Sequence, residues 1–347
     1  MTRVAVLGAG AWGTAIASVL AARLDVTLWA RDPAQAEAMA RTRRNERYLP
    51  GVELPRELRV RALAAGRDQL ARSDLVFLAV PSKALPGALA ELGGLGVSQR
   101  AGIVSLAKGL VPPDGLPASV ALENVYGSQR VACVGGPSHA REMVESGAGL
   151  VCASRSEALA HGVADAFQRA GVVCEVSDDP VGVELAGVAK NAAAVAVGAT
   201  QAQGLNAAGM AAADIFLEVL ALARASGGHA RTFVGRAGTG DLVATALAPT
   251  SRNRSAGELL AEGVPADEIP GRVGQAVEAL ETVRLLARAI ERERLDAPVV
   301  LALAHLIDGS MPLDEWIALV RAKQPPPARF SRPSTWWTRL RAWLRRR

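Results

Sequence analysis

Short apolar runs alternate with amphipathic segments along the first half of the chain. The runs are four to six residues long and rich in β-branched side chains, and they cover residues 4–7, 26–29, 75–80, 103–106, 131–134, 150–153 and 172–176. Strands that alternate with helices in this way form a mostly parallel sheet covered by helices. The pattern predicts an α/β, Rossmann-type N-terminal domain.

The pattern changes after Asp178-Asp179-Pro180, where apolar residues begin to recur every three or four positions, which is the helical period. Examples are Val277, Leu280, Val283, Leu286 and Ile290. The run 181–204 is long enough to cross a membrane, but it contains Glu184 and Lys190, which favours a buried helix of a soluble protein. We therefore expect an all-α C-terminal domain.

These patterns divide the chain into three parts. We place the α/β domain at residues 1–180, the helical domain at 181–323, and a Pro-rich linker with a basic Trp/Arg tail at 324–347; the motifs described below make the first the dinucleotide-binding domain and the second the substrate and catalytic domain. The second boundary follows from Gln324-Pro325-Pro326-Pro327, which cannot continue a helix. A chain of 347 residues, half of them apolar, is long enough for two filled cores.

Charge and cysteine usage narrow the class of protein, because they argue against nucleic-acid binding, a disulfide framework and a zinc site. The net charge is +5, but the last twenty residues hold seven arginines and no acid, so the remainder carries −2. A near-neutral body gives no reason to expect a nucleic-acid partner. The three cysteines lie in separate apolar segments without the close pairing of a disulfide framework or zinc site: Cys133, Cys152 and Cys174. They indicate a reduced, cytoplasmic protein with no metal site.

A glycine-rich motif follows the first predicted strand. Gly8-Ala9-Gly10-Ala11-Trp12-Gly13 runs directly into a predicted helix from Thr14 to Leu24. In this context Gly8 allows a tight turn, Gly10 lets the backbone approach a pyrophosphate, and Gly13 permits close helix packing. The helix N-terminus attracts the phosphate charge. The motif predicts a dinucleotide site.

The end of the second predicted strand bears on the choice of cofactor. Arg31 is suited to the extra phosphate of NADP or to stacking on adenine, whereas Asp32 is suited to the ribose of NAD or to capping the next helix. We favour NADP(H), with NAD(H) left open.

Four further segments carry polar groups suited to catalysis. Lys108 and the Gly135-Gly136-Pro137-Ser138 segment each follow a strand, and Ser138 is expected to cap a helix at 140–145. Lys190-Asn191 lies within an apolar helix, where the ammonium either extends to the surface along its apolar stem or is held for chemistry, since burial lowers an ammonium pKa towards that of a general acid. Asp241 lies in a glycine-rich turn, suited either to orient a lysine or to cap a helix. Ser251, Arg252 and Asn253 are suited to phosphate.

The ordered set of motifs resembles bacterial NAD(P)-dependent glycerol-3-phosphate dehydrogenase, from about residue 3 to 322. The matching motifs are Gly-Ala-Gly-Ala-Trp-Gly-Thr at 8–14, Asn-Glu-Arg-Tyr-Leu-Pro at 45–50, Ala-Lys-Gly-Leu at 107–110, Gly-Pro-Ser at 136–138, Lys-Asn at 190–191, Ala-Gly-Thr-Gly-Asp-Leu at 237–242 and Ser-Arg-Asn-Arg at 251–254. The resemblance implies reversible hydride transfer between NAD(P)H and dihydroxyacetone phosphate, giving sn-glycerol 3-phosphate for phospholipid synthesis.

The resemblance also implies residue roles. Lys190 is the expected proton donor, assisted by Lys108 and Asp241. The expected substrate-binding residues are Lys108, Gly136, Ser138, Lys190, Asn191, Asp241, Thr245, Ser251, Arg252 and Asn253. The expected cofactor-binding residues are Gly8, Gly10, Ala11, Trp12, Gly13, Arg31, Lys108, Ala140, Arg252 and Glu278. Two departures from the family pattern are Asp214, where an arginine is common, and His139, where an aromatic is usual.

Two alternative functions remain open. One is a β-hydroxyacid or 6-phosphogluconate-type dehydrogenase, against which the Ser251-Arg252-Asn253 set argues. The other is a non-catalytic nucleotide sensor, which the joint presence of Lys190 and Asp241 disfavours. As partners we expect the two small phosphates, a second copy of the chain in a homodimer, and weak contact of residues 335–347 with an anionic membrane. An expected helix there gathers Trp and Leu on one side, with Arg towards the edges and the opposite face. An unstructured arginine tail is the alternative.

Overall fold

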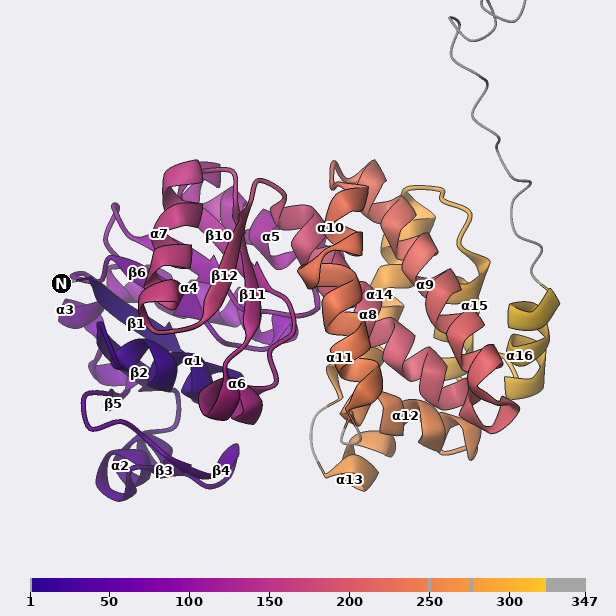
Figure 1. Ribbon diagram of the computed structural model, residues 1–347, viewed down its shortest axis with the longest axis horizontal. Coiled ribbons are helices and arrows are strands. Elements are labelled where there is room, and N and C mark those ends of the chain that lie inside the picture. The colour runs from indigo at the N-terminus through magenta and orange to yellow at the C-terminus, as the bar shows by residue number, and fades with distance from the viewer. Residues whose placement is uncertain (1, 249–250, 275–276, 323–347) are drawn as a thin grey trace, which may run out of the picture.

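The computed structural model describes residues 2–248, 251–274 and 277–322, and its two domains lie side by side (Figure 1). The N-terminal domain contains an eight-stranded sheet with the order β12-β11-β10-β7-β6-β1-β2-β5. The strands are β1 (Arg3–Leu7), β2 (Asp25–Ala30), β5 (Arg59–Ala62), β6 (Leu75–Leu78), β7 (Gly102–Ser105), β10 (Val131–Gly135), β11 (Gly149–Ser154) and β12 (Val173–Ser177).

Neighbouring strands of this sheet are parallel except for β10 and β11, so the prediction of a mostly parallel sheet is confirmed. All seven predicted strands are present. The sequence pattern missed β5 and four strands of two small ribbons: β3 (Arg44–Asn45), β4 (Leu49–Glu53), β8 (Leu110–Val111) and β9 (Leu116–Pro117). These strands are short or expose one face, which leaves them without a continuous apolar run.

Helices cover both faces of the sheet. On one face, Ile16 and Leu20 of α1 (Ala11–Ala21) and Phe167 of α7 (Glu157–Arg169) are fully buried in one core. On the other face, α4 (Leu85–Leu95) and α5 (Ala118–Tyr126) bury Leu92 and Leu122 in a second core. Short loops then leave the carboxyl ends of β1, β6, β7 and β10 together at one edge, which is where ligands bind in open α/β sheets.

The second domain is helical throughout its described residues. Its helices are α8 (Pro180–Thr200), α9 (Leu205–Ala225), α10 (Ala230–Val234), α11 (Asp241–Leu247), α12 (Arg252–Ala261), α13 (Ile269–Val273), α14 (Glu278–Arg292), α15 (Pro298–Ile307) and α16 (Leu313–Ala322). The amphipathic repeat at 277–290 forms α14, as predicted.

Helix α8 is the centre of this domain. Among the described residues, two helices are long and apolar enough to span a membrane. The apolar window of α8 is 94% buried inside the protein, which confirms the buried helix predicted at 181–204, and the window of α9 is 39% buried. Small residues allow close packing of α8 against α12, because a Cβ on Gly198 would lie 2.1 Å from the Arg254 carbonyl oxygen and one on Gly257 2.0 Å from that of Val195.

Helix α8 also joins the two domains. Asp179 caps its N-terminus, accepting a hydrogen bond of 2.8 Å from the Gly182 amide, directly after the last strand. Along its length α8 packs against β10, β11 and α5 on one side and against α9, α12 and α14 on the other. The helix therefore carries its polar residues, Lys190 and Asn191, to the edge of the sheet domain.

Candidate active site

The glycine motif forms the tight turn between β1 and α1 that the sequence predicts. Gly8 has a φ of +111°, and a Cβ there would lie 2.3 Å from the carbonyl oxygen of Ala79. A Cβ on Gly13 would lie 2.0 Å from the Gly8 oxygen. Asn45 buttresses the turn, since its Nδ2 donates to the Ala9 oxygen at 3.0 Å and to Thr14 Oγ1 at 2.7 Å.

The turn fits a dinucleotide. Gly10 is the N-cap of α1, makes no side-chain cap bond, and would meet nothing within 4 Å if it carried a Cβ. Backbone amides at an uncapped helix N-terminus, with open space beside them, suit a pyrophosphate. Ala11 is the first residue of α1, and Ala140 is the first residue of α6 (Ala140–Ser146), which follows β10 at the same edge.

Arg31 and Asp32 follow β2. Arg31 is exposed there, and Asp32 caps α2 (Pro33–Thr42) through a 2.9 Å hydrogen bond from the Ala34 amide. Of the two roles left open for Asp32 in the sequence, the helix cap is thus present.

Lys108 lies at the junction of the domains, on the loop that follows β7. Its Nζ is 3.2 Å from the Gly136 oxygen, 3.1 Å from Ser138 Oγ and 3.2 Å from Asp241 Oδ2. It also lies 5.5 Å from the centre of the Trp12 ring. The lysine therefore touches the nucleotide turn, the β10 loop and the helical domain at once.

Ser138 corrects one prediction. The N-cap of α6 is His139, which makes no side-chain cap bond. Ser138 Oγ instead donates a hydrogen bond to the Gly136 oxygen at 2.8 Å and accepts one from Lys108 Nζ. Gly136 has a φ of +100°, which turns the chain sharply after β10 and directs its carbonyl to the lysine. The segment thus binds Lys108 rather than capping the helix.

Asp241 holds two ammonium groups. Its Oδ2 lies 3.2 Å from Lys108 Nζ and 3.5 Å from Lys190 Nζ, and its side chain is 3% exposed. Burial opposes ionisation of this carboxyl, but the Lys108 and Lys190 charges outweigh burial and lower the pKa of Asp241. The carboxylate is therefore ionised and fixes the position of both lysines.

The backbone around Asp241 also differs from the prediction. The segment is a π-helical turn, η5 (Arg236–Gly240), that continues into α11 at Asp241, rather than the non-helical glycine-rich turn expected from the sequence. Gly238 is required there, because its Cβ would lie 2.1 Å from the Phe233 oxygen. Widened turns of this kind are frequent at functional sites, since they redirect a side chain that a regular helix would place elsewhere.

Lys190 has the environment of a proton donor. It lies in the middle of α8 with 8% of its surface exposed. Burial, reinforced by the Lys108 charge, lowers the pKa of Lys190 to about 8, although Asp241 opposes the shift. An ammonium with a pKa near neutrality combines sufficient acidity with adequate protonation at cellular pH.

Asn191 and Asn253 connect this cluster to α12. Asn191 Nδ2 donates to the Lys108 backbone oxygen at 2.9 Å, and Asn253 Nδ2 donates to Asn191 Oδ1 at 3.0 Å. Thr245 lies one turn beyond Asp241 on α11, and its buried hydroxyl has no hydrogen-bond partner among the described residues. The cluster therefore gathers polar groups from three helices, α8, α11 and α12.

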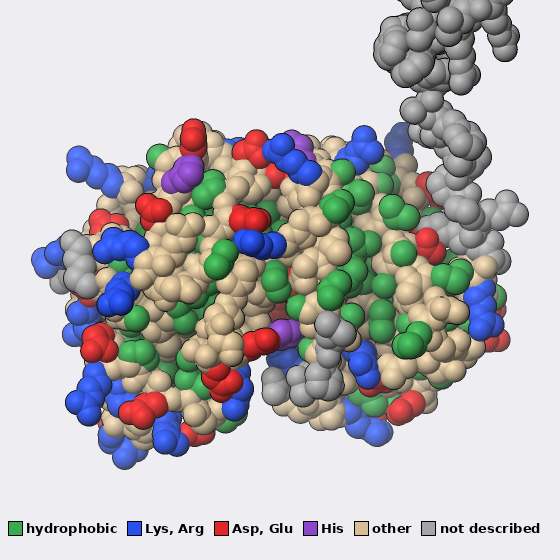
Figure 2. Space-filling model, viewed as in Figure 1, with side chains coloured by type: hydrophobic (Ala, Val, Ile, Leu, Met, Phe, Trp, Pro, Cys, Tyr) green, Lys and Arg blue, Asp and Glu red, His purple; other side chains and the backbone are tan. Residues whose placement is uncertain are grey.

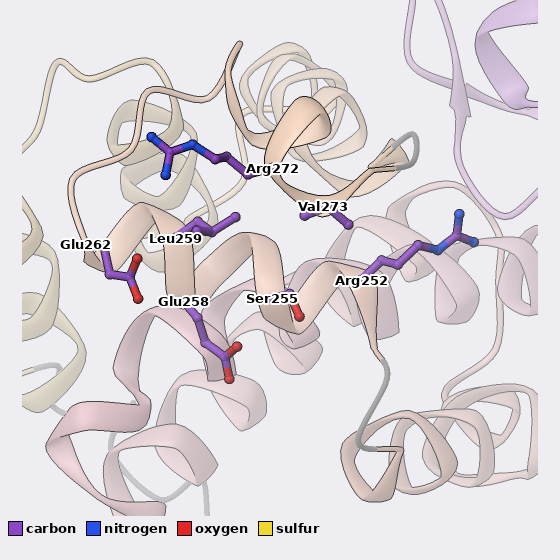
Figure 3. Close-up of a pocket in the computed structure, with 7 residues that line it drawn as sticks. All are labelled: Arg252, Ser255, Glu258, Leu259, Glu262, Arg272 and Val273. Atoms are coloured by element: carbon purple, nitrogen blue, oxygen red, sulfur yellow. The ribbon is translucent and has the colours of Figure 1, made fainter.

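Ser251 and Arg252 stand at the start of α12, where Ser251 is the N-cap. A pocket of about 420 Å³ runs along α12 and α13, and in Figure 3 the Arg252 side chain points away from its other lining residues, Glu258 and Glu262 among them. The pocket is thus beside the cluster rather than in it. Burial raises the pKa of Glu278, against the charges of Arg252 and Lys83.

Two residues of the site escaped the sequence interpretation. Asn45 entered the sequence interpretation only as part of a motif, because its place in the short strand β3 after α2 gave no sign of the turn that it supports. Lys83, in the short helix after β6, faces Glu278 across the domain boundary. Such partners come from distant segments, and only the fold reveals them.

A nucleotide turn that faces a buried lysine and its carboxylate across a domain boundary defines the class: a two-domain, nicotinamide-dependent dehydrogenase. Within that class, models of the two parts of one family match the chain. The NAD-dependent glycerol-3-phosphate dehydrogenase N-terminus matches residues 3–160, and the C-terminus matches residues 179–318. The chain belongs to this family, as the motifs in its sequence suggested.

Individual relatives support the same family assignment. The chain is 36% identical over 336 residues to glycerol-3-phosphate dehydrogenase [NAD(P)+] of Variovorax paradoxus, covering 94% of this chain and 98% of the relative, and 41% identical over 314 residues to that of Deinococcus radiodurans, covering 88% and 90%. Among solved structures, glycerol-3-phosphate dehydrogenase of Coxiella burnetii has a TM-score of 0.84 at 28% identity, covering 93% of this chain and 99% of that one. A 2-dehydropantoate 2-reductase of Geobacter metallireducens has a TM-score of 0.60 at 21% identity, covering 89% and 100%, which is likeness of fold alone.

Proposed function

We propose that this chain reduces dihydroxyacetone phosphate to sn-glycerol 3-phosphate in the cytoplasm, supplying phospholipid synthesis. The observation that carries the proposal is the cluster in which Asp241 fixes Lys108 and Lys190 at the edge of the sheet domain. Family membership supports the substrate, and the polar residues at the start of α12 support its phosphate.

The nicotinamide, when bound, supplies the hydride. The turn between Gly8 and Gly13 would hold its pyrophosphate, with Ala11, Trp12, Ala140 and Glu278 as further contacts. The chain's own part is to position the ketone and to balance charge. As the central carbon receives the hydride, its oxygen gains negative charge and takes the proton from Lys190 Nζ, leaving a neutral amine. Lys108 adds a positive charge beside that oxygen.

The substrate is oriented by groups on both domains. Gly136 and Ser138 stand on the sheet domain beside Lys108, and Asn191 and Thr245 stand on the helical domain. Ser251, Arg252 and Asn253 would bind the phosphate, whose binding energy fixes the ketone next to Lys190. A neutral ketone without phosphate loses that anchor.

The direct test is oxidation of NADPH or NADH by the purified protein with dihydroxyacetone phosphate. We expect turnover with this substrate and none with β-hydroxyacids or 6-phosphogluconate run in the oxidative direction. Turnover with a hydroxyacid alone would favour that alternative. Binding of the nucleotide without any turnover would favour a nucleotide sensor.

We further propose that NADPH is preferred over NADH. Arg31 supports this choice, because it is exposed directly after β2, where the adenosine end of a dinucleotide lies in Rossmann-type folds. Asp32 supports it as well, since its side chain is already engaged as a helix cap.

We also propose a homodimer. Three large apolar side chains support it by their exposure: Leu205 is 87%, Leu217 61% and Val234 76% exposed, on α9 and α10. Figure 2 shows hydrophobic side chains gathered on the face of the helical domain where these helices lie. Light scattering of the wild type and of Leu217→Glu tests the proposal, with the wild type expected at twice the monomer mass and the variant at the monomer mass.

The proposed membrane contact falls on residues 335–347, which lie outside the described residues. Its support is the sequence alone, in which this segment holds Trp336, Trp343 and five arginines. Sedimentation with anionic liposomes tests it, comparing the full chain with one that ends at Pro327. We expect the full chain in the pellet at low salt and the shortened chain in the supernatant.

A further inference from the structure

Besides Asp241 of α11, a buried carboxylate lies on α8 and takes no part in the proposed chemistry. Glu184 is 6% exposed and lies on the helix that carries Lys190 and Asn191. Its carboxylate accepts the Ser119 amide at 3.1 and 2.9 Å, one distance for each oxygen, and the Ser119 hydroxyl at 2.6 Å. A buried charge is costly unless it is well bonded, and this one is bonded entirely by the other domain.

The partner is the N-terminus of a helix. Ser119 is the second residue of α5, whose N-cap, Pro117, has no side chain able to cap it. Glu184 therefore supplies the missing cap from another domain, and the positive end of the helix dipole favours its negative charge. The contact joins α8 to the sheet domain at a fixed point.

Glu184 and Asn191 form a pair on α8. They are seven residues apart, about two helical turns, and thus face the same side of the helix. Asn191 also bonds to the sheet domain, through the Lys108 oxygen. A slip of α8 by one residue would move each side chain by about 1.5 Å along the axis and turn it by ~100°, which would break both contacts and remove Lys190 from Asp241.

We propose that Glu184 is a positioning residue for the reduction: by capping α5 at Ser119 it fixes the register of α8 on the sheet domain and so places the Lys190 ammonium at Asp241. The proposal rests on the function proposed above for Lys190. Glu184 bonds to Ser119 rather than to a residue of the Asp241 cluster, and its effect passes through Lys190, the neighbour of Asn191.

Glu184 also changes between its protonated and ionised forms near neutral pH. Burial raises the pKa of Glu184 to about 7, against hydrogen bonds from Ser119 and Ser105. The other ionisable groups that face it from the packed elements are Glu123 of α5, paired with Arg155, and Cys133 of β10. Above that pH the ionised form accepts all three hydrogen bonds, and charge-assisted bonds are the stronger ones.

The first test is a double-mutant cycle of Glu184→Ala with Lys190→Ala. We expect Glu184→Ala to lower kcat about tenfold or more, since small misplacements of a catalytic group are costly, with the nucleotide KM nearly unchanged. In the Lys190→Ala background the same substitution should cost nothing further in kcat. A full tenfold loss in that background overturns the positioning role, whereas an active Lys190→Ala single variant overturns the proposed function itself.

The matched control is Glu218→Ala. Glu218 of α9 is also buried and caps the N-terminus of α15, through the Val299 and Val300 amides at 3.1 and 2.7 Å, but both helices belong to the same domain. The Glu218→Ala substitution should lower the Tm and leave kcat unchanged. An equal fall of kcat in both variants would show that lost stability, not register, explains the effect, and would overturn the proposal.

The second test uses Glu184→Gln, which keeps the shape and stays folded if the alanine variant does not. The wild-type kcat/KM should rise with pH through about 7, as Glu184 ionises, and the glutamine variant should lack that rise while matching the wild type at pH 6. Because both proteins use the same substrate, its own phosphate ionisation cancels in the comparison. Identical profiles for the two proteins would overturn the proposal.

Discussion

The two domains contribute to the candidate site in different ways. In the sheet domain, each contributing residue follows a strand: Gly8 after β1, Lys108 after β7 and Gly136 after β10. In the helical domain, Lys190 lies in the middle of a helix and Asp241 and Arg252 at the start of one. Parallel topology alone gathers the first set at one edge, whereas the second set is gathered only by helix packing.

The proposed roles are also divided unequally between the domains. The sheet domain provides the nucleotide turn and Lys108, and the helical domain provides the buried Lys190, its partner Asp241 and the residues suited to phosphate. Substitutions in the nucleotide turn should therefore act mainly on nucleotide binding, and those in the helical domain mainly on turnover and substrate binding, and the predictions below test that division.

The largest effect is expected for Lys190→Ala. Loss of the general acid should lower kcat by about 10²–10⁴-fold, while nucleotide affinity, measured by fluorescence titration, stays close to the wild type because the turn lies in the other domain. A variant that keeps most of its kcat would remove Lys190 from the proposed role.

The nucleotide turn offers a paired test. Gly13→Ala should lower the Tm and abolish nucleotide binding, because its Cβ would lie 2.0 Å from the Gly8 oxygen. Gly10→Ala should keep the wild-type Tm and still raise the nucleotide KM, since its Cβ meets only open space in the protein. Thermal unfolding and initial rates separate the two effects. If Gly10→Ala bound the nucleotide normally, the pyrophosphate would not approach this turn.

In the helical domain, Arg252→Ala should lower the affinity for the substrate. A lost charge-assisted contact with phosphate costs about 1.5–3 kcal/mol, so KM for dihydroxyacetone phosphate should rise while activity on a ketone without phosphate hardly changes. Arg254→Ala is the matched control on the same helix, where Arg254 pairs with Glu258 at 3.0 Å. Equal losses with both ketones would contradict the phosphate assignment.

The smallest effect is expected at Arg31. Arg31→Ala should raise the KM for NADPH more than that for NADH, by a few-fold, since a guanidinium in contact with an exposed phosphate contributes modestly. Arg23→Ala, before β2 at the opposite edge of the sheet, should change neither constant. An unaltered ratio of the two constants in Arg31→Ala would show that Arg31 does not read the extra phosphate.

The same contrast explains how far the sequence could be interpreted. The positions of seven strands, the nucleotide turn and Lys108 could be placed because each depends on a local pattern. Two local predictions were wrong. Ser138 bonds to Lys108 instead of capping α6. The segment before Asp241 is a π-helical turn, although its glycines are typical of a non-helical turn. Glu184 resembles any helical acid in the sequence, because its partner, Ser119, is 65 residues away.

The central claim is that Lys190, held by Asp241 beside Lys108, donates the proton. The most direct measurement is the pH dependence of kcat/KM for reduction of dihydroxyacetone phosphate, which reports ionisations of the enzyme before the substrate binds. Because burial and Lys108 lower the pKa of Lys190 to about 8 and reduction needs the protonated form, kcat/KM should fall as the pH rises through about 8, and the rate of the reverse oxidation should rise there. A reduction rate that stays constant through pH 9.5 would contradict the account.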